Sequence, residues 1–293
     1  MKPSTATAGA LLTAVSALGF STLPVFGVVA YRAGANVVTV LAVRFVIAAI
    51  LLWGYLLLTR TALPDRRTGV QLLLMGGVGY TTMSVLYLSA VAEDRLSPSL
   101  AALLLYTYPA VVALEARLTD RHPFTGRQAT ALPLTLAGVA LVLLTPGTGS
   151  RFTPIGAALA LGAAAVYATY IYFGSRVTRR TSPLVAATYV ATAAAAVFLG
   201  YGLVTGTLVQ VALPGWLAIA GTAVFATVLA VLLFFAGIER LGPARASIIS
   251  TLEPVGTALL STMLFGDRLG QGQVVGGVLV LAGVLWLQMG RSA

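Results

Sequence analysis

The sequence Leu96-Ser97-Pro98 returns as Leu241-Gly242-Pro243, at an interval of 145 residues along the chain. The same interval separates Tyr108-Pro109 from Glu253-Pro254. Matches that keep one register over such a distance predict a chain built from two copies of one unit. The first copy is expected at about residues 1–147 and the second at about 148–293.

The composition places this repeat in a membrane. The chain is 58% hydrophobic and 9% charged, whereas soluble domains carry about 25% charged residues. A soluble fold could not cover its surface with so few charges, so residues 1–293 are predicted to form a single membrane domain in a lipid bilayer. The net charge of +10 does not indicate nucleic-acid binding, because the charges lie between apolar runs, where membrane orientation requires them.

Several kinds of chemistry are excluded by residue type. The chain has no cysteine, and its only histidine, His122, lies in a charged loop. Disulfides, thiolate or histidine metal sites and histidine-based catalysis are therefore not expected. No Walker-type loop is present, so direct use of ATP is not expected. An enzyme would need a nucleophile with a base, or metal ligands, at membrane depth, so we predict no enzymatic activity, no metal and no cofactor.

Ten apolar runs are long enough to cross a bilayer as helices, for which roughly 20 residues are needed. Lipid-exposed irregular backbone would leave its polar groups unpaired, so these runs predict an all-α membrane protein. The ten runs lie near residues 8–31, 36–58, 69–91, 97–117, 126–145, 155–175, 184–204, 214–236, 243–264 and 272–290.

Basic residues orient these spans, because cytoplasmic loops are enriched in Lys and Arg. Thirteen basic residues fall on the side of the termini and four (Arg32, Arg95, Arg151 and Arg268) on the other. Both termini are therefore predicted to be cytoplasmic in a multi-pass protein of a bacterial-type inner membrane. Five helices per unit is an odd number, so the second copy enters from the opposite side. The prediction is two inverted five-helix repeats, an arrangement that suits alternating access.

Several motifs resemble the EamA repeat, and together they indicate the ten-helix branch of the drug/metabolite transporter superfamily. The motifs are Val43-Arg44-Phe45, Leu105 to Pro109, Ser250 to Gly256, and Leu264 to Leu269. The resemblance implies a central cavity lined by helices 1, 3, 4, 6, 8 and 9, with helices 5 and 10 outside that ring. The sequence departs from the family pattern at Tyr108, where an acid is usual before the proline, and at Asp267, where a glutamate is usual.

Glu253 is the strongest candidate for substrate binding, since it lies about 15 Å deep in the ninth helix and intramembrane charges are functional by default. It could bind an ammonium group or exchange a proton; alternatively, it satisfies polar groups beside Pro254, which removes a helical hydrogen bond. Arg44, about 12 Å deep, could be a buried charge partner of Glu253, could bind carbonyls, or could bind an anion. A lone arginine disfavours phosphorylated substrates, which need several cationic groups.

A set of aromatic and hydroxyl side chains is also predicted to line the cavity, because tyrosine combines an apolar ring with a polar tip. Ordinary helix packing or an interfacial aromatic belt is the alternative, and Tyr31, Tyr55 and Tyr201 are assigned to such a belt. Three prolines are predicted hinges for the access change, namely Pro24, Pro109 and Pro254. The predicted lining residues are Ser16, Phe20, Tyr80, Ser84, Tyr87, Tyr106, Tyr108, Tyr167 and Tyr170.

These features together predict a secondary transporter that exports amino acids or related small metabolites by alternating access through a central cavity. The substrate cavity would combine aromatic walls, hydroxyls and one acid. The alternative is efflux of drugs or cationic compounds, which small multidrug pumps of the superfamily achieve with a glutamate in the first helix. The first span here carries no acid. The protein is expected to be a monomer or a homodimer.

Overall fold

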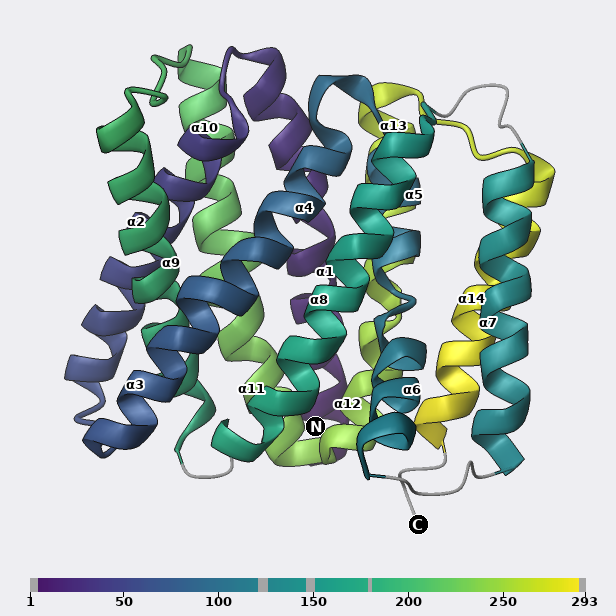
Figure 1. Cartoon of the computed structure of the whole chain (residues 1–293). Coiled ribbons are helices and arrows are strands. Elements are labelled where there is room, and N and C mark those ends of the chain that lie inside the picture. Colours follow the sequence, from purple (N-terminus) through teal and green to yellow (C-terminus); the bar gives the residue numbers. More distant parts are fainter. Residues whose placement is uncertain (1–4, 121–125, 146–150, 179–180, 290–293) are drawn as a thin grey trace.

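The computed structural model describes residues 5–120, 126–145, 151–178 and 181–289, and these ranges form a bundle of helices (Figure 1). Within them, nine helical segments are long and apolar enough to cross a membrane, and Ala129–Leu144 is a shorter apolar helix. The prediction of an all-α membrane protein is confirmed. The predicted boundary between the repeats, at residues 147 and 148, lies outside the described residues.

The first half of the chain forms five spans. Two of these spans are interrupted helices: the third contains a π-helix, and the fourth is broken in the middle. In order, the elements are α1 (Thr5–Arg32), α2 (Val37–Leu58), α3 (Arg66–Leu74), the π-helix η1 (Met75–Tyr80), α4 (Thr81–Val91), the short 3-10 helix η2 (Ala92–Asp94), α5 (Pro98–Leu105), α6 (Tyr108–Asp120) and α7 (Gly126–Leu144).

The second half repeats this pattern, including the π-helix in its third span and the break in its fourth. The predicted spans agree closely with the helices, and the largest difference is in the eighth span, which continues to Leu241. In order, the elements are α8 (Pro154–Thr178), α9 (Pro183–Thr205), α10 (Leu213–Ala223), the π-helix η3 (Val224–Leu229), α11 (Ala230–Leu241), α12 (Pro243–Ser250), α13 (Leu252–Phe265) and α14 (Gln271–Met289).

The helix contacts follow an internal twofold relation. In one set, α1 packs on α11 and α13; in the equivalent set, α8 packs on α4 and α6. The equivalent helices α1 and α8 run in opposite directions through the bundle, so the repeat is inverted (Figure 1). The start of α1 and the end of α14 lie at the same side of the molecule, as an even number of spans requires (Figure 1).

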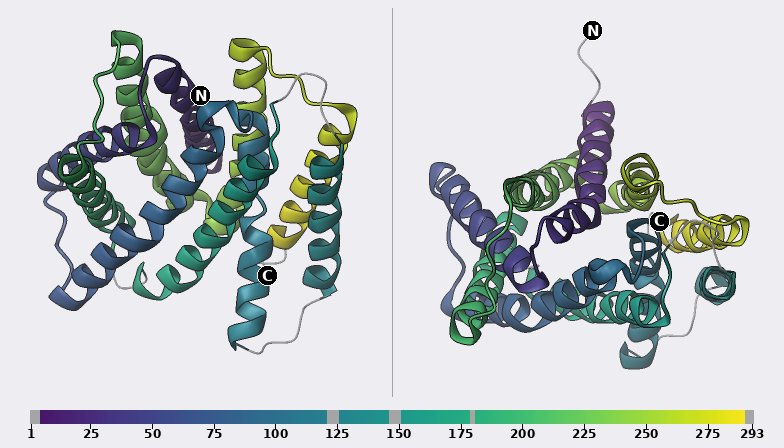
Figure 2. Two further views of the ribbon diagram at one scale, coloured as in Figure 1. Left: turned by 45° about the horizontal axis from the view of Figure 1, so that its top comes forward. Right: turned by 90° about the horizontal axis from the view of Figure 1, so that it is seen from above.

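Two helix pairs close the ends of the molecule. At one end α7 packs on α14, and at the other α2 packs on α9 (Figure 2). A Cβ atom added at Gly138 would lie 2.6 Å from the backbone oxygen of Gly276, and the reverse distance is also 2.6 Å. Small residues therefore allow the backbones of α7 and α14 to touch. This peripheral pair corresponds to helices 5 and 10, which the family resemblance places outside the ring.

The two π-helices are held by threonine hydroxyls. A π-turn widens the helix by one residue, and such turns are frequent at functional sites. The Thr81 hydroxyl donates to the Gly76 carbonyl at 2.9 Å, and the Thr227 hydroxyl donates to the Thr222 carbonyl at 3.0 Å. In both cases the acceptor lies five residues earlier, so the hydroxyl covers a carbonyl of the widened turn. Tyr80 and Thr227 lie in these turns, and both are near one buried arginine described below.

Candidate functional site

The break between α12 and α13 exposes one backbone acceptor, and Tyr106 covers it. Pro254 has no N–H, so the carbonyl four residues earlier, that of Ser250, lacks its helical partner. The Tyr106 hydroxyl, from the equivalent break between α5 and α6, donates to this carbonyl at 2.5 Å. The polar defect that was the alternative role for Glu253 is therefore satisfied by a tyrosine from the other repeat, and the Glu253 carboxyl is left for other partners.

The Tyr106 hydroxyl also lies 3.0 Å from Glu253 Oε2. A phenol has one proton, so it cannot donate to the Ser250 carbonyl and to a carboxylate at the same time. When Glu253 is protonated, its hydroxyl donates to the Tyr106 oxygen and both acceptors are satisfied. When Glu253 is ionised, one acceptor loses its donor. The hydrogen bonding at this break therefore differs between the two protonation states of Glu253, which is half-buried.

A continuous row of aromatic rings, termed here the aromatic row, leads from this break into the bundle. Successive ring centroids are 4.8 to 6.1 Å apart, within the range of favourable aromatic pairs. The five tyrosines come from the break between α5 and α6 and from α6, α8 and η1, so the row joins both repeats. In order, the rings are Tyr106, Tyr108, Tyr167, Tyr170, Tyr80, Phe45 and Phe198.

Arg44 lies at the other end of the aromatic row. Its side chain is 2% exposed, its guanidinium lies 4.7 Å from the centroid of the Phe45 ring, and its Nε donates to the Thr227 hydroxyl at 2.9 Å. Tyr31, Tyr80 and Tyr87 lie within electrostatic range of the guanidinium. A buried arginine is tolerated only when paired or hydrogen-bonded, and here neutral oxygens and a ring face supply that environment.

Arg44 and Glu253 were considered as a charge pair, and the structure gives them separate partners. Within the part of the chain that the structure describes, no ion pair joins these two side chains. Tyr87, which is buried on α4, lies within electrostatic range of both charges. The two charges therefore lie at separate ends of one tyrosine-rich region.

The other predicted lining residues have more varied places. Ser16 donates to the Ala230 carbonyl at 2.6 Å, which fastens α1 to α11. Phe20 is half-buried on α1. Ser84 is buried, and among the described residues its hydroxyl has no hydrogen-bond partner. Of the predicted hinges, Pro24 lies buried within α1, while Pro109 and Pro254 each follow the break in a fourth span.

Several residues of this region were absent from the sequence-based set. Thr227 bonds Arg44 from η3, and Phe45 and Phe198 complete the aromatic row. Tyr31, assigned to the interfacial belt, donates to the Leu88 carbonyl at 3.1 Å. The motif containing Arg44 and Phe45 was a usable signal for Phe45. No local pattern distinguishes Thr227 from the other threonines of these helices.

The described residues hold no group of three or more His, Cys, Asp or Glu side chains that could bind a metal. The side chains of the candidate site are one carboxyl (Glu253), one guanidinium (Arg44), several phenols and apolar ring faces. This combination suits noncovalent binding of a small amphipathic molecule, with hydroxyls to orient it and the carboxyl to contact a cationic group.

Comparison with known proteins bears on the whole chain. A family model described as the EamA-like transporter family matches twice, at residues 7–144 and 154–289. The chain is 27% identical over 281 residues to the "Uncharacterized transporter YcbK" of Bacillus subtilis (strain 168), covering 92% of this chain and 89% of the relative. It is 30% identical over 257 residues to the "Uncharacterized inner membrane transporter YedA" of Escherichia coli (strain K12), covering 83% of this chain and 79% of the relative.

The fold is also similar to one seen by crystallography. A protein of known crystal structure superposes with a TM-score of 0.65 at 18% identity, covering 97% of this chain and 99% of the other. This likeness concerns the arrangement of helices alone. The family model, for its part, matches each half of the chain once, in agreement with the repeated architecture.

Proposed function

Since the chain belongs to the EamA-like transporter family and is a multi-pass membrane transporter, we propose that it exports amino acids or related small metabolites. Transport is secondary, by alternating access, and the protein has no enzymatic activity. The two inverted repeats exchange conformations about the break in each fourth span, where Pro109 and Pro254 weaken the helix. Pro24 is a third bending point.

One observation carries this proposal, namely the placement of Glu253. The carboxyl sits at a helix break, 3.0 Å from the Tyr106 hydroxyl, and the backbone defect beside it is already covered. A substrate ammonium group can bind the carboxylate, while the rings of Tyr108 and Tyr167 receive the apolar part of the substrate. The lone Arg44 is occupied by Thr227 and by ring contacts, so the site does not favour phosphorylated substrates.

The same geometry allows proton exchange at Glu253. An ammonium group that binds the carboxylate replaces the proton that otherwise satisfies Tyr106, so substrate and proton compete for one oxygen. Competition of this kind couples export to an inward proton gradient. The coupling requires only that Glu253 is exposed to each side of the membrane in turn.

We place the protein in a bacterial inner membrane with both termini in the cytoplasm. The excess of basic residues on the side of the termini supports this orientation. The repeat boundary is proposed near residues 147 and 148. The functional unit is a monomer or a homodimer. One chain contains both repeats and the complete candidate site, so a second copy is not needed to complete it.

The alternative is efflux of drugs or other cationic compounds. The aromatic row favours it to the extent that tyrosine faces also bind organic cations. The two proposals differ in what the site must recognise: an amino acid brings a carboxylate as well as an ammonium, whereas a drug cation does not.

Flux from proteoliposomes tests the proposal. Purified protein is reconstituted, and export of amino acids, sugars, nucleobases and cationic dyes is measured with and without a pH gradient. We expect saturable flux of amino acids, and loss of that flux in Glu253→Gln. No flux across the whole panel would contradict transport of this substrate class, and flux of dyes alone would establish the alternative.

A further inference from the structure

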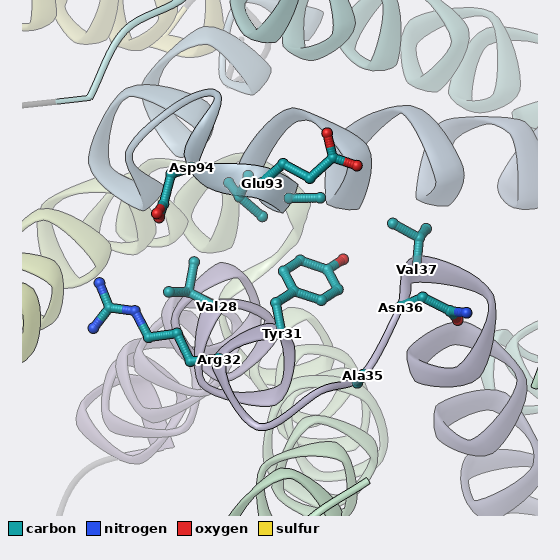
Figure 3. A pocket seen from close by; sticks show the side chains of 10 residues that line it. Val28, Tyr31, Arg32, Ala35, Asn36, Val37, Glu93 and Asp94 are labelled. Carbon is teal, nitrogen blue, oxygen red and sulfur yellow. The ribbon is translucent and has the colours of Figure 1, made fainter. Parts of the chain in front are cut away.

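A cavity opens at the face of the molecule opposite the chain termini, and we call it the vestibule. It has a volume of about 380 Å³ and lies between the end of α1, the start of α2 and η2 (Figure 3). This volume is near the lower end of the range for small-molecule sites, which is roughly 300–1,000 Å³. The vestibule is separate from the break that holds Glu253, which is not among its lining residues.

One end of the vestibule carries opposite charges. The side chains of Arg32 and Asp94 lie at this end, whereas Glu93 turns its carboxylate away from them (Figure 3). The Arg32 guanidinium lies 4.6 Å from the centroid of the Phe265 ring, and among the described residues no carboxylate pairs with it. Asp94 pairs with Arg151, and Glu93 pairs with Arg95. Arg32 is therefore the cation that a carboxylate ligand would meet.

A second cavity adjoins this charged end and shares Arg32 and Asp94 with the vestibule. It measures about 40 Å³ and is also lined by Ser97 and Asp267, which are 4% and 5% exposed. Asp267 Oδ2 accepts from the hydroxyls of Ser99 at 2.6 Å and Ser261 at 2.9 Å.

Two of the residues that line this second cavity each carry a buried polar atom without a partner among the described residues. Within the described residues, neither Asp267 Oδ1 nor the Ser97 hydroxyl has a hydrogen bond. Buried polar atoms without partners are rare and require an explanation. A volume of this size admits a water molecule or an ammonium group, and an ammonium would supply the donors that Asp267 Oδ1 lacks.

The rest of the vestibule is lined by apolar side chains together with Asn36 and Glu93. Val37 and Val91 line this part, Val28 lies beside Arg32 and Asp94, and Tyr31 lies between the charged end and Asn36 (Figure 3). An α-amino acid carries its carboxylate and its ammonium on the same carbon, with the side chain projecting away from both. The vestibule has a matching layout, with Arg32 and Asp94 at one end and the Tyr31 ring, Val37 and Val91 beyond them.

We propose that the vestibule is a second binding site for an α-amino acid in its zwitterionic form. Arg32 binds the carboxylate, and Asp94 with Asp267 and Ser97 binds the ammonium. The inference rests on the proposed function for its substrate class. It adds a recognition site at the face where, in the proposed orientation, an exported amino acid leaves the protein.

Equilibrium binding to the full-length protein in nanodiscs tests this site. The probes are L-phenylalanine, N-acetyl-L-phenylalanine, which lacks the ammonium, and L-phenylalaninamide, which lacks the carboxylate. Glu253→Gln serves as the background, because it removes the acid of the other site. In this background we expect L-phenylalanine to bind and each derivative to bind about tenfold to a hundredfold more weakly, as expected for loss of hydrogen bonds to a charged group.

Variants of the two charged residues assign the binding to the vestibule. Arg32→Gln and Asp94→Asn should each weaken L-phenylalanine binding by about tenfold or more. Arg32→Lys keeps the charge and should retain most of the affinity, which guards against a loss caused by misfolding. Arg268→Gln is the matched control, because Arg268 is an exposed arginine of the same face that does not line the vestibule.

The outcomes separate this inference from the transport proposal. Equal affinities for the three probes, or unchanged binding in Arg32→Gln and Asp94→Asn, would overturn the vestibule site whatever the flux. Arg32-dependent binding in a protein that transports no amino acid would support the vestibule site and contradict the proposed export.

Discussion

The breaks in the two fourth spans have the same backbone arrangement but carry different side chains. The first falls at Tyr106 and Thr107, and the second at Thr251, which occupies the position of Tyr106 in the repeat. Each break is followed by a proline at the same distance. The first break contributes phenols, from Tyr106 and Tyr108, whereas the second contributes the acid Glu253 at the position of Tyr108.

This difference shows how an inverted repeat acquires an asymmetric site. The proline at each break frees one carbonyl, but a tyrosine of the first repeat covers the carbonyl of the second. Tyr106 thereby joins the two breaks, and only the second break carries an acid, Glu253. The repeated backbone provides the bending points, and the side chains that differ provide recognition.

The largest effect is expected from removing the acid. Glu253→Gln keeps the shape of the side chain but loses its charge, so we expect amino-acid flux to fall at least about tenfold, since binding of a substrate ammonium loses a charged partner. The double variant Tyr108→Glu/Glu253→Gln moves the acid to the equivalent position at the first break. This variant should not restore flux, because it also removes the Tyr108 ring, which packs 4.8 Å from that of Tyr167.

Proteoliposome flux of both variants, with and without a pH gradient, is the measurement. Normal gradient-driven transport by Glu253→Gln would refute proton coupling at this residue. Restored flux in the double variant would show that the two breaks are interchangeable.

Removing the Tyr106 hydrogen bond that joins the two breaks should lower the stability of the protein. Tyr106→Phe leaves the Ser250 carbonyl without its donor, and an unsatisfied buried acceptor costs about 1–3 kcal/mol. We expect a lower melting temperature than for Tyr108→Phe, which keeps the same ring row and leaves the Ser250 contact intact. Thermal unfolding in detergent measures both. Equal melting temperatures would remove Tyr106 from its proposed role at the break.

Replacing the hinge prolines tests whether the breaks move. Pro109→Ala and Pro254→Ala each restore a backbone N–H, so the local helix becomes continuous and stiffer. We expect slower flux in both variants and trapping of one access state, read from cysteine labelling at each face. Pro24→Ala tests the third proposed bending point, which lies within the unbroken helix α1. Unchanged flux and unchanged accessibility in all three would contradict hinge action.

A smaller difference distinguishes the starts of the third and eighth spans. Asp65 caps α3, and hydrogen bonds from the Thr68 hydroxyl and from the Thr68 and Arg67 N–H groups hold its pKa below the ordinary carboxyl value. Ala212 starts α10 without a side-chain cap. The Asp65 contribution is present above the carboxyl pKa of the unfolded chain and is lost as pH falls through the lowered folded value.

We therefore expect Asp65→Ala to lower the melting temperature slightly at neutral pH, with the difference from the parent shrinking in acid. Thermal scans from about pH 7 to pH 3 cover this titration. If the difference in melting temperature between Asp65→Ala and the parent does not change with pH, the effect does not come from the charged cap.

Much of the fold was predictable because each span depends on its own residues. The tenth run, near residues 272–290, needed only its apolar composition to predict α14. The two π-helices were not predicted, because a widened turn produces no change in hydropathy. Asp267 and Ser97 were not predicted as neighbours, because they come from different repeats and meet only through packing.

The sequence by itself determined the number of spans, their inversion and the membrane setting, since a membrane helix satisfies its own backbone and its hydropathy is local. Only the tertiary structure decided the partners of the buried charges. Tyr106 and Glu253 are 147 residues apart in sequence, and Arg44 and Thr227 are 183 apart. Contacts of this kind depend on the rotation and depth of each helix to within about an ångström, and residue patterns within a single helix do not encode that placement.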